Sequence, residues 1–330
     1  VGESKLLRSV LRLGLLIPAL VVRIEPAFAA DQSFAAWLQD FRREAIATGI
    51  SPATVDKALN GVEPIPRVIE LDRRQPEFTL SFPEYMSKVV SADRVTRGRQ
   101  MMRDNQAPLG AITRRFQVQA RFVVALWGVE SDYGRLAGSY QIIPSLATLA
   151  YDGRRSVYFR SELIAALKIV DQDKIAPQDL LGSWAGAMGQ SQFMPSSFLR
   201  YAVDFDGDGR PDIWHSKADI FASAANYLVQ AGWHMDQTWG RAVQVPARFN
   251  PADADLKVEK PIAAWNAEGL RRINGGALPL KAGLTGSVIL PEEGHSSAYL
   301  VYDNFRSLLK WNRSYFFGIA VGTLADRIGD

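Results

Sequence analysis

The chain of 330 residues contains no cysteine. A disulfide framework, a thiolate nucleophile and a cysteine-ligated metal are therefore excluded, and we expect no lipid anchor on an N-terminal cysteine. The net charge of the chain is also small. The formal net charge is +3, and residues 1–30 carry four basic and two acidic side chains, so the rest of the chain is almost neutral. Without a basic surplus, we expect no nucleic-acid partner.

Long hydrophobic runs are lacking as well. The run Leu13–Val22, ten residues long, is too short to span a bilayer. It follows a basic segment and precedes the small-x-small pattern Ala27-Phe28-Ala29, an order typical of an export signal. We therefore predict that residues 1–30 are a cleavable signal peptide, that the mature protein is periplasmic, and that it has no transmembrane segment. The alternative is that the run forms a short core helix.

What the chain does contain is mostly helical spacing of apolar residues, over 31–60, 84–130, 146–232 and again from Phe305 to Ile328. Helices followed by strands and a closing helix indicate an α+β fold that is mainly helical, rather than a parallel βαβ sheet. Three short segments rich in β-branched or aromatic residues predict the strands of a small β lobe: Ala242–Val245, Gly286–Leu290 and Ala298–Tyr302.

Glu130 closes the apolar helical segment Phe122–Glu130. Apolar side chains seven, four and three residues earlier share its helix face, so its carboxyl group belongs to an apolar stripe. An apolar surround disfavours the charged form of a carboxyl group and raises its pKa, which suits a general acid near neutral pH. The alternative is a glutamate paired with Arg121 or Arg135. Gly134 is expected to end the helix.

A second acidic pattern, Asp204–Arg210, matches the first half of an EF-hand loop, with carboxylates at positions 1, 3 and 5 and glycine at 6. His215 replaces the usual glutamate at position 12, and Asp219 is the candidate for closing a longer loop. We predict one structural calcium ion, because three like charges this close repel unless a cation neutralises them. The alternative is an acidic turn without an ion. The predicted ligands are Asp204, Asp206, Asp208, the carbonyl of Arg210, and Asp219.

The stretch Gly182–Ser197 carries no charge and mixes small residues with tryptophan, methionine, phenylalanine and glutamine. Small residues allow backbone to approach a ligand closely. Glutamine and serine offer neutral hydrogen bonds, and aromatic faces stack on sugar rings. A sugar-binding surface and a tightly packed helix junction are both consistent with this composition.

In this combination and order, the segments resemble the membrane-bound lytic murein transglycosylase B family, over roughly residues 33–328. The motifs that carry the resemblance are Arg74–Phe78, Glu84-Tyr85, Gly128–Gly134, Ser145–Tyr151, Gly182–Ser197, Asp204–Asp208, Ala225–Tyr227 and Trp311–Ser314. Phe317 stands where some members have a groove tyrosine. Since no cysteine lies near residue 30, the membrane attachment in the family name is not expected here.

The resemblance implies a lysozyme-like core with a flanking helical lobe and a small antiparallel β lobe. It implies cleavage of the β-1,4 bond between N-acetylmuramic acid and N-acetylglucosamine in peptidoglycan glycan strands, with Glu130 as the catalytic acid/base. The residues that it implies for substrate binding are Tyr85, Tyr158, Ser183, Gln192, Tyr227 and Asn312.

The expected domains are a signal peptide (1–30), an N-terminal helical lobe (31–120), a lysozyme-like catalytic core with the EF-hand-like loop (121–235), a small β lobe (236–303) and a C-terminal helix closing on the core (304–330).

The leading hypothesis is a lytic transglycosylase that forms 1,6-anhydro-muramyl products. A hydrolase of this kind normally needs two carboxylates. Near Glu130 the motif supplies only Asp132, which lies roughly 200° around the helix axis, on the other face. A single acid/base is sufficient if the substrate supplies its own nucleophile. The alternatives are a lysozyme-type muramidase and a non-catalytic, calcium-stabilised glycan-binding protein.

Overall fold

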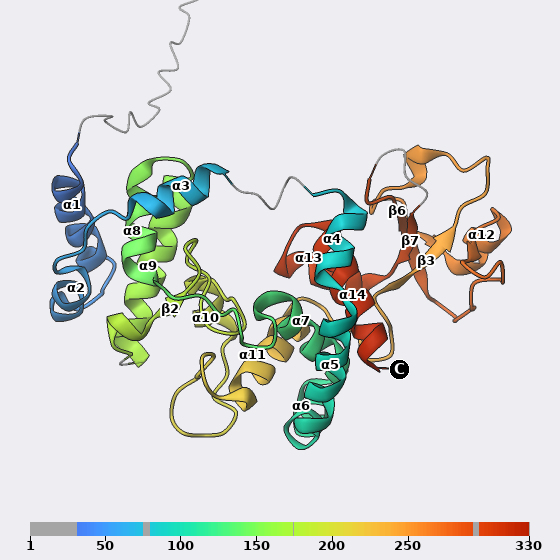
Figure 1. The fold of residues 1–330 in the computed structure, drawn as a ribbon, viewed down its shortest axis with the longest axis horizontal. Helices are drawn as coiled ribbons and strands as arrows, with labels where there is room; N and C mark the ends of the chain where they lie inside the picture. The colour runs from blue at the N-terminus through green and yellow to red at the C-terminus, as the bar shows by residue number, and fades with distance from the viewer. Residues whose placement is uncertain (1–31, 75–79, 174, 293–296, 330) are drawn as a thin grey trace, which may run out of the picture. The chain divides into compact units, whose positions relative to one another are not determined.

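The computed structural model describes residues 32–74, 80–173, 175–292 and 297–329 (Figure 1). The predicted signal peptide, residues 1–30, and most of the motif Arg74–Phe78 lie outside the described residues. From Ser33 onward the chain forms one compact unit. Within the described ranges, no helix has both the length and the apolar character needed to cross a membrane.

Fourteen α-helices account for most of the described residues, as the helical spacing predicts. Serine is the N-cap residue of several of these helices. At α2 (Pro52–Leu59), the side chain of Ser51 accepts a hydrogen bond from the backbone N–H of Thr54 (3.2 Å), and the first helical residue is proline. The helices are α1 Phe34–Ala47, α2 Pro52–Leu59, α3 Pro66–Arg74, α4 Phe82–Val89, α5 Ala92–Asp104, α6 Gln106–Phe116, α7 Ala120–Ser131, α8 Ile142–Asp152, α9 Ser156–Asp173, α10 Pro195–Tyr201, α11 Lys217–Gln230, α12 Ile262–Ala267, α13 Asp303–Trp311 and α14 Tyr315–Gly329.

The predicted β lobe is a five-stranded antiparallel sheet with strand order β4-β6-β7-β3-β5. Its three longest strands overlap the three segments that the sequence predicts, with ends that differ by at most two residues. A separate two-stranded ladder pairs Tyr140 with Gly182. The strands are β1 Tyr140–Gln141, β2 Leu181–Gly182, β3 Gly240–Gln244, β4 Lys260–Pro261, β5 Arg271–Arg272, β6 Thr285–Ile289 and β7 Ala298–Val301.

The closing segment is two helices rather than the one expected. α13 ends at Trp311 and α14 begins at Tyr315. Between them, the side chain of Asn312 accepts a hydrogen bond from the backbone N–H of Ser314 at 3.0 Å. Such local side-chain to backbone bonds compete with helix continuation, which is why asparagine and serine favour turns.

The buried apolar side chains form three clusters. The first joins α4 to α7 with α11, α13 and α14. The second joins α1 to α3 with α8 to α10, and the third lies between the five-stranded sheet and α12. In Figure 1, α1 and α2 accordingly lie beside α8 and α9, while α7 lies near α14. Each of the first two clusters contains residues from before and from after position 120, the predicted end of the N-terminal lobe. The domain boundaries given above stay a prediction.

Trp311 is shared between clusters. Although half-buried, it packs against both the first and the second. It stands at the last residue of α13, and it therefore lies where the two helical groups meet.

Candidate active site

Glu130 lies in the last turn of α7 and is half-buried. Its Oε1 accepts a hydrogen bond from the indole Nε1–H of Trp311 at 2.6 Å. The apolar stripe predicted on α7 faces a small internal cavity beside the carboxyl group. The cavity is lined by Val123, Leu126, Trp127, Glu130, Ser191, Ile220, Phe221, Ala224 and Trp311.

The two arginines considered as alternative partners of Glu130 make other ion pairs. Arg121 pairs with Asp326 of α14 at 3.0 Å. Arg135 pairs with Asp132 at 3.1 Å. The geometry therefore favours the interpretation of Glu130 as a carboxyl group on an apolar face.

The end of α7 differs from the expectation. The helix ends at Ser131, and Asp132 (φ 52°) and Tyr133 (φ 61°) both adopt the left-handed conformation before Gly134 is reached. The side chain of Ser131 accepts a hydrogen bond from the N–H of Gly134 at 3.1 Å. Left-handed backbone is unfavourable for residues with a Cβ, so the tertiary contacts of these two side chains must hold the turn.

Asp132 is held by arginines from a neighbouring helix. Its side chain is 5% exposed and pairs with Arg94 at 3.2 Å, Arg97 at 2.8 Å and Arg135 at 3.1 Å. Burial by itself raises the pKa of Asp132, but hydrogen bonds from Arg97 and Arg94 outweigh it and leave the pKa below its ordinary value. Asp132 is thus a fixed carboxylate directed toward α5.

Tyr133 fills the space between α5 and α7. Its hydroxyl donates a hydrogen bond to the carbonyl of Arg94 at 2.9 Å. A Cβ at Gly128 would lie 2.7 Å from the tyrosine ring, and one at Gly98 would lie 2.5 Å from its hydroxyl oxygen. The glycine that precedes Glu130 in the motif is therefore required by packing, because any larger side chain would displace Tyr133.

Two side chains of the Gly182–Ser197 stretch reach α7. Gln190 accepts a hydrogen bond from Nε1–H of Trp127 at 2.8 Å and donates one to the carbonyl of Trp214 at 2.6 Å. Ser191 is buried and lines the cavity beside Glu130. The stretch is accordingly a packed junction, and it also contributes to the surroundings of the carboxyl group.

The predicted binding residues Ser183 and Gln192 lie in this stretch. Ser183 is half-buried, and its hydroxyl accepts the N–H of Ala187 at 3.1 Å. Gln192 has left-handed backbone (φ 48°), and its side-chain amide donates to the carbonyls of Ala137 (2.9 Å) and Gly189 (2.7 Å). These bonds fix the orientation of the amide.

Tyr227 joins the aromatic group around Trp311. Its ring centroid lies 4.6 Å from that of Trp311, and its hydroxyl donates to the carbonyl of Lys310 at 2.6 Å. Burial raises the pKa of Tyr227 to about 12, so it stays a neutral hydrogen-bonding group.

Tyr85 and Asn312 line a different pocket from the cavity beside Glu130. The pocket has a volume of about 560 Å³, and Phe317 lines it too. Tyr158, at the start of α9, is 43% exposed, and its contacts are with Phe159 at 5.2 Å between ring centroids and with the guanidinium of Arg155. The structure thus brings Tyr85 and Asn312 together and places Tyr158 in separate surroundings.

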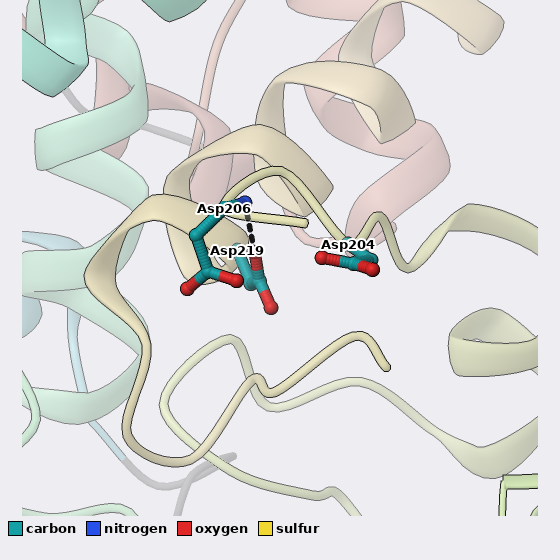
Figure 2. A group of neighbouring side chains, drawn as sticks. All are labelled: Asp204, Asp206 and Asp219. Carbon is teal, nitrogen blue, oxygen red and sulfur yellow. Dashed lines mark hydrogen bonds between the residues drawn. The ribbon is translucent and has the colours of Figure 1, made fainter. Parts of the chain in front are cut away.

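Three of the predicted metal ligands converge (Figure 2). Carboxylate oxygens of Asp204, Asp206 and Asp219 lie within 4.8 Å of one another. Asp208 and Arg210 are exposed residues outside this group, joined by a hydrogen bond from the N–H of Arg210 to Asp208 at 3.1 Å.

Asp219 is completely buried at the start of α11. Burial raises the pKa of Asp219, and the nearby charge of Asp206 raises it further. Hydrogen bonds from the backbone N–H groups of Asp212, Phe205 and Asp206 act in the opposite direction, but the pKa stays above its ordinary value. An all-carboxylate oxygen set is the type that Ca²⁺ and Mg²⁺ prefer. A cation at this position would favour the ionised forms of all three groups, so the residues fit a hard divalent ion.

Comparison with known proteins places the chain in a family. A family model described as a transglycosylase SLT domain matches residues 33–326. The chain belongs to the transglycosylase SLT domain family. The match spans every described candidate residue, from Tyr85 to Asn312.

The relatives agree with this membership. The chain is 31% identical over 257 residues to membrane-bound lytic murein transglycosylase B of Escherichia coli, covering 74% of this chain and 66% of that protein. It thus spans just under two thirds of the relative's length.

Solved structures of the family are also similar. SltB3 from Pseudomonas aeruginosa, in complex with NAG-anhNAM-pentapeptide, is 44% identical with a TM-score of 0.86, covering 91% of this chain and 80% of that one. The Escherichia coli lytic transglycosylase Slt35, in complex with calcium, is 28% identical with a TM-score of 0.76, covering 88% and 92%. The predicted fold class, mainly helical α+β with a lysozyme-like core, is confirmed.

Sequence reasoning missed two residues that make hydrogen bonds with α7 around Glu130. Trp311 was part of a recognised motif, but its hydrogen bond to Glu130 spans 181 positions and has no local signal. Gln190 was noted only as one of several neutral polar side chains, yet it ties the stretch to α7. A weak signal existed for Trp311, because a tryptophan that is not fully exposed usually finds an acceptor for its N–H.

Proposed function

We propose that this protein is a lytic transglycosylase. It cleaves the β-1,4 bond between N-acetylmuramic acid and N-acetylglucosamine in peptidoglycan and forms 1,6-anhydro-muramyl ends. The observation that carries the proposal is the contrast between two neighbouring carboxyl groups: Glu130 faces an apolar cavity, while Asp132 is held by three arginines. Among the described residues that line the cavity, Glu130 is the one carboxyl group, where a hydrolase of this kind uses two.

The reaction follows from a single acid/base. The carboxyl group of Glu130 gives its proton to the glycosidic oxygen as the bond from C1 of the muramic acid breaks. The acetamido oxygen of the same sugar closes on C1 and stabilises the positive charge. The C6 hydroxyl then attacks C1, displaces the acetamido oxygen and returns its proton to the Glu130 carboxylate. No water is consumed, and Glu130 ends in its starting form.

The remaining candidate residues are proposed to hold the glycan. The neutral hydroxyl of Ser183 and the oriented amide of Gln192 suit the acetamido group of the reacting sugar. Tyr227 adds an aromatic face beside Glu130. Tyr85 and Asn312 are proposed for sugars in the pocket that they line together, and the exposed ring of Tyr158 for a sugar further along the strand. Support for such a ligand comes from SltB3, whose structure holds NAG-anhNAM-pentapeptide.

Product mass tests the proposed reaction. Purified murein is digested with the protein, and the muropeptides are weighed by mass spectrometry. Anhydro products are lighter by one water than the hydrolytic products and add no reducing ends. Products with reducing-end muramic acid would instead support the muramidase alternative, and binding without any released product would support a non-catalytic glycan-binding protein.

We further propose one structural calcium ion in the loop before α11. Its ligands are Asp204, Asp206, Asp208, the carbonyl of Arg210, and Asp219. The convergence of three of these carboxylates supports the site, and so does the calcium complex of Slt35, a structural relative.

We also propose export to the periplasm, where peptidoglycan is found. The support is the signal-like pattern of residues 1–30. N-terminal sequencing of protein recovered from cells should give a chain that begins at about Ala30 or Asp31. Recovery of an uncleaved chain in the cytoplasm would contradict this localisation.

A further inference from the structure

The side chain of Trp311 donates a hydrogen bond to the carboxyl group of Glu130. Its Nε1 lies 2.6 Å from Oε1 of Glu130, a distance typical of a charge-assisted hydrogen bond. An indole N–H is a donor only. It therefore interacts best with an oxygen that does not carry the proton, and better still with an ionised carboxylate.

The ring of Trp311 is fixed by aromatic neighbours from two other segments. Its centroid lies 5.2 Å from that of Phe193, in the Gly182–Ser197 stretch, and 4.6 Å from that of Tyr227, on α11. Tyr227 in turn donates its hydroxyl to the carbonyl of Lys310, the residue before Trp311. A donor held on several sides can orient its acceptor, because neither group is free to rotate away.

Glu130 is the one titratable side chain among the described residues that line the cavity; α11 contributes only Ile220, Phe221 and Ala224 to it. Several charged groups on the elements packed against α7 and Trp311 make contacts elsewhere. Arg94 and Arg97 of α5 pair with Asp132, and Arg121 of α7 pairs with Asp326 of α14. Arg115 of α6 lies over the rings of Phe116 and Phe205. Lys310 of α13 donates a hydrogen bond to the carbonyl of Ala231.

We propose that Trp311 is a positioning residue for Glu130: its N–H keeps Oε1 as the accepting oxygen, so that Oε2 carries the transferable proton, and it favours the carboxylate left after that proton is given up. The inference rests on the proposed function of Glu130 as acid/base. Trp311 acts through Glu130, and it sets both the direction of proton transfer and the pH at which the acid form is lost.

The test is Trp311→Phe in the full chain, assayed by the release of anhydro-muramyl products from purified murein over a range of pH. Phenylalanine keeps an aromatic ring and removes the donor. The basic limb of kcat/KM, which reports loss of the acid proton in the free enzyme, should move up by about one pH unit, the size expected for one charge-assisted hydrogen bond. The kcat should fall about tenfold, while KM stays almost unchanged because the ring contacts remain.

Trp233→Phe is the matched control. Trp233 belongs to the same buried cluster, and its Nε1–H donates to Oε1 of Gln119 at 2.8 Å. This variant loses the same kind of hydrogen bond away from Glu130, so its basic limb should not move. An unmoved limb in Trp311→Phe, or an equal shift in both variants, would overturn the proposal.

Two further measurements keep the outcome decisive. If Trp311→Phe does not fold, β-(3-benzothienyl)alanine at position 311 preserves the shape of the indole and replaces its N–H with sulfur. If the wild-type products are not anhydro sugars, the proposed reaction fails, but the positioning role is still measurable. ¹³C NMR titration of the Glu130 carboxyl group, assigned by its loss in Glu130→Gln, should show a higher midpoint without the donor; an unchanged midpoint would refute the role.

Discussion

The end of α7 buries Asp132, and the start of α11, next to the acidic loop, buries Asp219; the two aspartates are stabilised in opposite ways. Asp132 is surrounded by arginine side chains that lower its pKa. Asp219 is buried near two other carboxylates, and its pKa is raised. The first region carries its own counter-charges. The second brings together negative charges that a bound cation would balance, so its stability should depend on the concentration of divalent cations in the solution.

This difference shows how one fold places similar side chains in different electrostatic surroundings. At the end of α7, arginines stabilise the ionised form of Asp132, whereas Glu130 lines an apolar cavity. Between the loop and the start of α11, three carboxylates converge, an arrangement that fits the calcium ion proposed above. Charge by itself does not determine what an acidic side chain does; the neighbours supplied by other helices do.

The largest effect should come from removing the exchangeable proton. Glu130→Gln is nearly isosteric but cannot act as an acid or base, so turnover should fall by at least about 10²–10⁴. The melting temperature should barely change, because the amide can still accept from Trp311. Product release from purified murein measures the first effect and thermal denaturation the second. Turnover close to that of the wild type would remove Glu130 from the mechanism.

Removing calcium should have the next largest effect. An ion that binds only the folded chain stabilises it by about 2.7 kcal/mol at a hundredfold excess over Kd. A chelator should therefore lower the melting temperature, and added calcium should restore it. Asp206→Ala should abolish this response. Identical melting curves with and without chelator, after exhaustive stripping of metal, would show that the loop is an acidic turn without an ion.

The variant Asp132→Asn tests the other region of this comparison, the end of α7. Losing this carboxylate removes the counter-charge of the partly buried Arg94 and leaves Arg97 with Asp93 alone, which should cost about 1–3 kcal/mol of unfolding free energy. Unlike Asp206→Ala, the variant should retain the full response to calcium. Urea denaturation with and without chelator separates the two. Loss of the calcium response in Asp132→Asn would mean that the regions are coupled rather than independent.

The smallest effect concerns pH. The folded-state pKa of Asp132 lies below its ordinary value of 3.8. Its contribution to stability is therefore fully present well above pH 3.8 and is lost as the pH falls through the lowered folded-state value. The stability difference between the wild type and Asp132→Asn should accordingly narrow in acid. A difference that stays constant down to the acid transition would show that Asp132 does not titrate differently in the folded protein.

Many of the helices and strands could be predicted from the sequence because they depend on local patterns of residues. The apolar spacing of α7, the proline after Ser51, and the β-branched segments that became β3, β6 and β7 each depend on residues a few positions apart. The end of α7 was not readable in this way. Gly134 is the residue that local rules favour for a helix end, but ion pairs from α5 and the packing of Tyr133 hold the turn earlier in the chain.

The sequence by itself determined that Glu130 closes an apolar helix face, that acidic residues alternate from Asp204 to Asp208, and that both belong to one family pattern. Only the tertiary structure decided the partners of the two acidic groups at the end of α7: Trp311 for Glu130 and arginines for Asp132. The physical reason is distance along the chain. Periodicity and turn chemistry act over a few residues, whereas the partner of a buried polar group is selected when helices far apart in sequence pack together.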